Sequence, residues 1–109
     1  MKIKHSKAMA LVKQFSKSKP VCKVTFTLPS EVVVDAKKVA VLGDFNEWSS
    51  TATLLKKQKD GQYKVSVELP VGSEFQFRYL IDESNWINDE AADKYVANGF
   101  TTDNSVVVL

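Results

Sequence analysis

The chain has 109 residues, of which 44% are apolar and 26% are charged, and its formal net charge is +2. This length fits one domain with one hydrophobic core, and the balance is that of a globular protein rather than a disordered one. No apolar run approaches the ~20 residues that span a bilayer, and the single cysteine, Cys22, has no partner in the chain for a disulfide.

The start of the chain, MKIKHSKAMALVKQF, is basic, and every charged residue before Glu31 is a lysine. Its apolar run, AMALV, is shorter than the ~7 residues that a signal peptide needs. We therefore expect a cytoplasmic protein. The low net charge, and lysines that do not alternate with aromatic residues, also argue against a nucleic-acid partner.

Residues 6–15, SKAMALVKQF, have the spacing of an amphipathic helix, with Ser6 as a plausible N-cap. The apolar residues at i, i+3, i+4 and i+7 are Ala8, Leu11, Val12 and Phe15. We expect a short basic N-terminal helix and a linker within residues 1–20, followed by a domain over residues 21–109. Such a helix would pack on the domain or dock a partner, and contact with an anionic membrane is the alternative.

From Val21 onward the apolar period changes from 3.6 to 2, which is the period of a strand with one buried face. Asp60-Gly61 is a hairpin-turn signal, and the segment between Asp82 and Thr102 has no clear period. Strands at intervals of ~8 to 12 residues predict an antiparallel β-sandwich of about 90 residues. The expected strands are residues 21–28, 38–43, 52–57, 62–69, 74–81 and 104–109.

The segment VAVLGDFNEW, residues 39–48, leaves a strand and places two aromatic residues among small polar ones. We expect Gly43 to permit a turn, Phe45 to anchor the loop in the core, and Trp48 to remain outside.

Trp86 lies in the irregular segment ESNWINDE, and Arg78 alternates with Phe77 and Tyr79. If Phe77 and Tyr79 face the core, Arg78 points outward. A single tryptophan is often a core or edge residue, and a single exposed arginine is usually only solvated. Two loop tryptophans with an outward arginine between them in sequence are a more specific combination.

Three motifs together resemble a known family. VAVLGDFNEWS is similar to the GxFNxW strand and loop of family 48 carbohydrate-binding modules, which include the glycogen-binding domains of AMP-activated protein kinase beta subunits and the early-set domains of glycogen branching and debranching enzymes. LPVGSEFQFRYLIDESNW resembles that family's LPxGxxxYKFxVDGxW, and GFTTDNSVVVL resembles its GTxNNxIxV. The resemblance covers roughly residues 21 to 109. IDESNW has one residue more than VDGxW and lacks its glycine.

The resemblance implies an all-β, immunoglobulin-like early-set sandwich that binds α-1,4-glucan, as glycogen, starch or maltooligosaccharides, without catalysis. Carried over by motif, Trp48 and Trp86 are the two tryptophans that stack on glucose. The other implied site residues are Arg78 in place of a lysine, Asn104 as the sugar-binding asparagine, Phe100 near an apolar contact, and Thr102 near a hydrogen-bonding threonine.

The chemistry of these residue types agrees with the resemblance. A pyranose ring has flat apolar faces with C–H groups and a rim of hydroxyls. Tryptophan offers the largest flat apolar surface at low cost in side-chain entropy, and arginine and asparagine can each present two groups to neighbouring hydroxyls.

Glycoside hydrolysis generally needs two carboxylates on either side of a sugar. The acids Asp82, Glu83, Asp89, Glu90 and Asp93 instead cluster in one segment, which we expect to be a solvated loop. We therefore expect no catalytic residue, no metal and no cofactor.

One alternative to sugar binding stays open. An early-set domain can serve as a protein-docking or regulatory module of glycogen metabolism, because the edges of a sandwich invite strand pairing. A glycogen-metabolising enzyme would then be the partner, and a homodimer is one form of this alternative.

Overall fold

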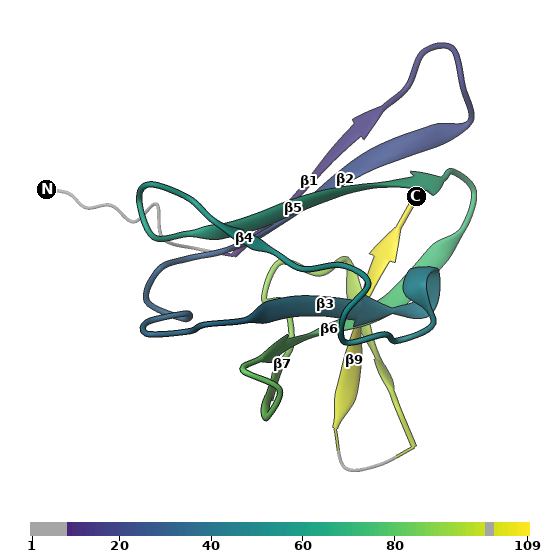
Figure 1. Cartoon of the computed structure of the whole chain (residues 1–109). Helices are drawn as coiled ribbons and strands as arrows, with labels where there is room; N and C mark the ends of the chain where they lie inside the picture. The colour runs from purple at the N-terminus through teal and green to yellow at the C-terminus, as the bar shows by residue number, and fades with distance from the viewer. Residues whose placement is uncertain (1–8, 100–101) are drawn as a thin grey trace, which may run out of the picture.

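The computed structural model describes residues 9–99 and 102–109, and these form two antiparallel sheets packed as a sandwich (Figure 1). The first sheet has the order β1-β2-β5-β4, and the second has the order β3-β6-β9-β8 with β7 paired to β6. The elements are β1 Ala10–Phe15, β2 Val21–Leu28, β3 Val39–Gly43, the short 3₁₀ helix η1 Asp44–Asn46, β4 Lys56–Lys57, β5 Tyr63–Pro70, β6 Glu74–Ile81, β7 Asn85–Ile87, β8 Lys94–Ala97 and β9 Asp103–Val108. The predicted antiparallel β-sandwich is confirmed.

Alternation along the strands fills the space between the sheets. On β2, every second side chain is wholly buried: Cys22, Val24, Phe26 and Leu28. The Phe26 ring meets Phe77 edge-on, with centroids 5.2 Å apart, and lies 6.3 Å from Tyr79, also edge-on. Burying one such aromatic side chain contributes about 1.5–3 kcal/mol, so these rings are a large part of what holds the sheets together.

The helix predicted for residues 6–15 is wrong over Ala10–Phe15, which form β1. This strand pairs antiparallel with β2, with Leu11 opposite Phe26 and Phe15 opposite Cys22. A helix this short is marginal in water, whereas pairing with β2 gives hydrogen-bond partners to the backbone groups along one edge of this segment. Residues 1–8 of the predicted segment lie outside the described residues.

The stretch without a clear period holds two short strands, β7 and β8, and a buried carboxylate between them. Asp89 is wholly buried, so the expectation of a solvated acidic loop is wrong for this residue. Its carboxylate accepts hydrogen bonds from the Tyr79 hydroxyl at 2.5 Å and from the Ala91 N–H at 2.7 Å, and its own N–H donates to Ser105 Oγ at 2.9 Å. Burial raises the pKa of Asp89, and burial together with this carboxylate raises the pKa of Tyr79.

In the described part of the chain, no helix is both long enough and apolar enough to cross a membrane.

Candidate functional site

The outer face of the second sheet carries an apolar floor. Phe77 and Tyr79 are wholly buried in the core, so Arg78 and Leu80, which alternate with them on β6, point outward as predicted for Arg78. The outward residues of β3 lie beside them, because Ala40 pairs with Leu80 and Leu42 pairs with Arg78. Ala40, Leu42 and Leu80 form a separate cluster of buried residues on this face.

Trp48 covers that apolar cluster. Its half-buried ring packs against Ala40, Leu42 and Leu80. Its backbone is left-handed, with φ of 57°, and its N–H donates to the Gly43 carbonyl at 3.0 Å. The indole Nε1–H donates to Asp44 Oδ1 at 3.1 Å. Packing and two hydrogen bonds therefore fix this ring on the surface of the sheet.

Of the two residues before Trp48 whose roles were predicted, Phe45 has the predicted role and Gly43 does not. Phe45 packs against the core, stacked on Phe26 at 5.8 Å, as expected. Gly43 is extended, with φ of −167°, so it does not make the turn. It is needed for close approach instead, since a Cβ there would lie 2.5 Å from the Gln76 carbonyl oxygen. The reversal comes from Glu47 and Trp48, which are both left-handed.

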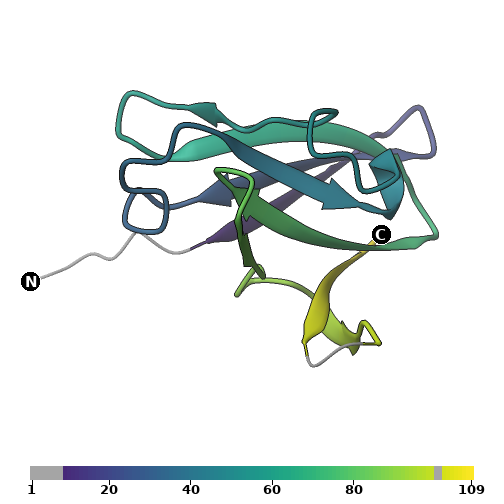
Figure 2. The ribbon, with the colours of Figure 1, turned by 60° about the horizontal axis from the view of Figure 1, so that its bottom comes forward.

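Trp86 reaches the same face from the other end of the strands. On β7 it pairs with Leu80, so it shares the outward face of that residue. Its side chain is 43% exposed, and the Arg78 guanidinium lies 5.5 Å from its ring centroid, a cation–π contact. The Arg78 Nε atom is buried and has no hydrogen-bond partner within residues 9–99 and 102–109. Figure 2 shows η1 at the Gly43 end of β3 and the β6–β7 turn toward the opposite end.

The extra residue in IDESNW is absorbed by a tight turn over residues 81–84. Asp82 and Glu83 both have positive φ, 52° and 62°, and the Ser84 N–H donates to the Ile81 carbonyl at 3.2 Å. Positive φ at both central positions is the requirement of a type I′ hairpin turn. Two non-glycine residues thus replace the family glycine, and Trp86 still enters the sheet in register with Leu80.

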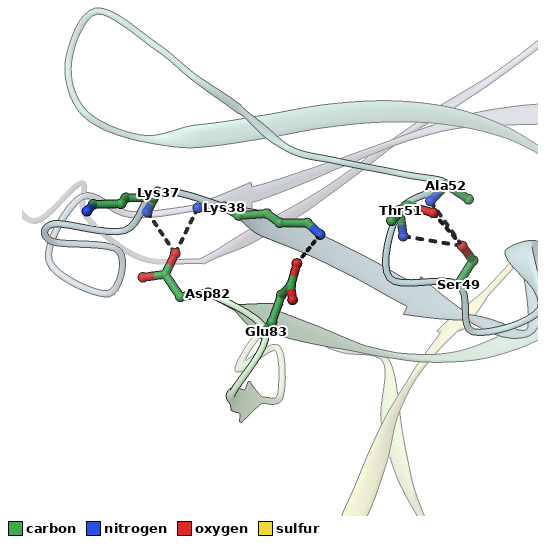
Figure 3. A network of polar contacts seen from close by, with 7 residues as sticks. All are labelled: Lys37, Lys38, Ser49, Thr51, Ala52, Asp82 and Glu83. Atoms are coloured by element: carbon green, nitrogen blue, oxygen red, sulfur yellow. Dashed lines mark hydrogen bonds and ion pairs between the residues drawn. The ribbon is translucent and has the colours of Figure 1, made fainter.

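Figure 3 shows hydrogen bonds that Asp82, in the turn before Trp86, and Ser49, which follows Trp48, accept from neighbouring backbone N–H groups. Asp82 Oδ1 accepts the N–H groups of Lys37 and Lys38, each at 2.8 Å, and these bonds lower the pKa of Asp82. Lys38 also pairs with Glu83 at 2.5 Å. After Trp48, Ser49 Oγ accepts the N–H groups of Thr51 and Ala52, at 3.2 Å each. Both tryptophans are therefore next to turns that side-chain hydrogen bonds stabilise.

A polar row continues the face across β6 and β9. Asn104 is mostly buried, and its Nδ2 donates to Gln76 Oε1 at 3.0 Å. Asn98 Nδ2 lies 3.3 Å from Asn104 Oδ1 and 2.8 Å from Thr102 Oγ1. Thr102 is exposed at the end of this row. Phe100 lies outside the described residues.

Residues 31–108 match the family model described as the glycogen recognition site of AMP-activated protein kinase. The chain belongs to this family. A comparison with curated proteins gave no match. The match starts after β2 and contains every predicted site residue, so the resemblance found in the three sequence motifs is confirmed at the level of the family.

Two residues of this glycogen-recognition domain were not predicted from the sequence. Asp44 accepts a hydrogen bond from the Trp48 indole, and Gln76 accepts one from the Asn104 amide. A signal for the apolar floor was present, because VAVL on β3 is apolar at every position, which is typical of a strand covered on both faces. No comparable pattern marks Asp44 or Gln76, since their partners are set by the packing of β3, β6 and β9.

Proposed function

We propose that this domain binds α-1,4-glucan chains of glycogen, starch or maltooligosaccharides by stacking glucose units on Trp48 and Trp86, without catalysis. The observation that carries the proposal is the shared position of two indoles and Arg78 on the outer face of one sheet, within the segment that matches a glycogen recognition site. The flat rings suit the apolar faces of the sugar, and the polar groups beside them suit its hydroxyls.

The polar groups of this face come from two strands, Arg78 from β6 and Asn104 from β9. The Arg78 guanidinium, stacked on Trp86, offers donors to hydroxyls of the glucose unit bound there. The Asn104 amide has spare hydrogen-bonding capacity beyond its bonds to Gln76 and Asn98, because an amide has two N–H donors and two oxygen lone pairs. The family resemblance implies that Phe100 and Thr102 also contact the glucan.

Isothermal titration with maltoheptaose tests the proposal. An open site of this kind should bind with a dissociation constant on the order of micromolar to millimolar, or about −4 to −8 kcal/mol. Trp48→Ala and Trp86→Ala should each weaken binding by at least about tenfold. Phe15→Ala is the matched control, because Phe15 is an aromatic residue of the first sheet that is 56% exposed. No heat from the parent protein, or equal binding by all four proteins, contradicts the proposal.

A cytoplasmic domain of this kind would bring a glycogen-metabolising enzyme to its polysaccharide. We expect glycogen beads to retain such an enzyme only when this chain is present, and we expect Trp48→Ala to abolish that retention. Retention that is the same with Trp48→Ala argues against this role.

Docking of a second copy of the chain is a second candidate function. β1 is an edge strand of the first sheet, and its side chains Val12 and Phe15 are 48% and 56% exposed. Unpaired edges favour strand addition. Light scattering after size exclusion should then give a dimer that Phe15→Lys converts to a monomer, and a monomeric parent removes this candidate.

A further inference from the structure

We infer that Asp44 is a positioning residue that fixes the Trp48 indole for stacking, an inference that rests on the glucan-binding function proposed above. One carboxylate links two elements of the face. Its Oδ1 accepts the Trp48 Nε1–H at 3.1 Å, and its Oδ2 accepts the Gln76 backbone N–H at 2.8 Å. Trp48 is thereby tied to β6, the strand that also carries Arg78.

The hydrogen bond to Asp44 adds a directional restraint to the apolar packing that holds the Trp48 ring on the sheet. Trp48 packs on small and aliphatic side chains, Ala40, Leu42 and Leu80, and such contacts have little directional preference. The Nε1–H···Oδ1 bond adds a direction, because hydrogen bonds weaken steeply away from linear geometry. The ring therefore presents one defined face outward before any sugar arrives.

The same bond gives the two tryptophans different chemical roles. The Trp48 indole N–H is already used by Asp44, so this residue offers a sugar its apolar face. The Trp86 indole N–H has no hydrogen bond within the part of the chain described here, and its side chain is 43% exposed. Trp86 can therefore stack on one sugar and donate to a hydroxyl, whereas Trp48 can only stack.

Glu47 provides a matched control for the charge of Asp44. It lies in the same loop, next to Trp48, is exposed, and its carboxylate makes no hydrogen bond within the described residues. Glu47→Gln therefore removes one negative charge near the ring without removing an acceptor. Asp44→Asn also removes one charge, but it replaces one of the two acceptor oxygens by a donor.

Two measurements on the full chain test the role of Asp44. In ¹H–¹⁵N spectra without sugar, Asp44→Ala should shift the Trp48 Nε1–H resonance and speed its hydrogen exchange, and should leave the Trp86 resonance in place. In titrations with maltoheptaose, Asp44→Ala should weaken binding by about 3- to 10-fold, the cost of ordering one side chain on binding. Asp44→Asn should lose less affinity than Asp44→Ala, and Glu47→Gln should stay within about twofold of the parent.

The outcomes separate this inference from the proposed function. If the parent fails to bind maltoheptaose, the proposed function fails, and the positioning role fails with it. If the parent binds maltoheptaose and both Asp44→Ala and Asp44→Asn bind it as tightly as the parent does, only the positioning role is overturned. An unchanged Trp48 Nε1–H resonance in both variants overturns it as well. Because Asp44→Asn is isosteric, it keeps the test usable if Asp44→Ala does not fold.

Discussion

The two tryptophan loops reach the same face of one sheet by different physical means. Trp48 follows a 3₁₀ turn, is half-buried, and has its indole hydrogen-bonded to Asp44. Trp86 lies on a three-residue strand, is 43% exposed, and contacts Arg78 through its ring. The Trp48 ring packs on the sheet and contributes to the fold, whereas the Trp86 ring is more exposed.

The largest expected effect near Trp86 comes from removing the buried carboxylate of Asp89, which follows β7 in the chain. Asp89→Ala leaves the Tyr79 hydroxyl and the Ala91 N–H without their acceptor in a buried region. We expect a loss of about 3 kcal/mol in the free energy of unfolding, measured by urea denaturation. Glu90→Ala, at an exposed neighbour, should stay within about 0.5 kcal/mol of the parent. Equal midpoints for the two variants would show that the Asp89 network is not a support.

Substitution of Gly43 should disrupt the packing of β3 on β6 next to the Trp48 loop. In Gly43→Ala the new methyl group would lie 2.5 Å from the Gln76 carbonyl oxygen and 2.9 Å from Phe77 Cβ, so β3 and β6 must move apart. We expect a loss of about 1–3 kcal/mol in the free energy of unfolding. Gly72→Ala meets no atom within 4 Å but has positive φ, so it reports backbone strain without a clash. A smaller loss for Gly43→Ala than for Gly72→Ala contradicts the close-approach explanation.

Replacing each tryptophan in turn tests how much each ring contributes to the stability of the fold. Trp48→Ala uncovers the cluster of Ala40, Leu42 and Leu80 and should cost about 1–3 kcal/mol of stability. Trp86→Ala removes an exposed ring and should cost about 0.5 kcal/mol or less. Thermal unfolding of the two variants under the same conditions decides the matter, and equal shifts in the midpoint would remove the contrast.

The smallest expected effect is the pH dependence that Asp82 gives to the Trp86 turn. Its pKa is lowered in the folded protein, first by the N–H groups of Lys37 and Lys38. A lowered pKa means that Asp82 adds stability above its unfolded pKa, about 3.9, and that this stability is lost as the pH falls through the folded pKa. Asp82→Ala should therefore narrow the stability difference between pH 7 and pH 3. An unchanged difference in urea midpoints would contradict this.

The clearest sequence signals predicted the strands that alternate most regularly. Residues 21–28 and 74–81 were predicted with the bounds that β2 and β6 have, because one face of each strand is apolar over eight residues. The helix prediction for Ala10–Phe15 failed because a segment of six residues can satisfy a helical and a strand pattern at once. β7 and β8 gave no signal, since three or four residues are too few to show a period and their place depends on the buried Asp89.

In the candidate site too, features with a local sequence signal were predicted and features that depend on tertiary contacts were not. Local alternation was enough to predict that Arg78 points outward and that Phe45 packs in the core. Asp44 could not be predicted, because its second partner, Gln76, is 32 residues away in the sequence and is brought near only when β3 pairs with β6. The roles of Trp48, Trp86 and Asn104 in binding sugar stay predictions.

A titration of ¹⁵N-labelled protein with maltoheptaose, followed by ¹H–¹⁵N spectra, tests the central claim most directly. We expect the Nε1–H resonances of Trp48 and Trp86 to shift together with backbone amides of β6 and β9, while those of β1 and β2 stay in place. Shifts confined to the first sheet, or no shift at millimolar sugar, would contradict glucan binding on the tryptophan face.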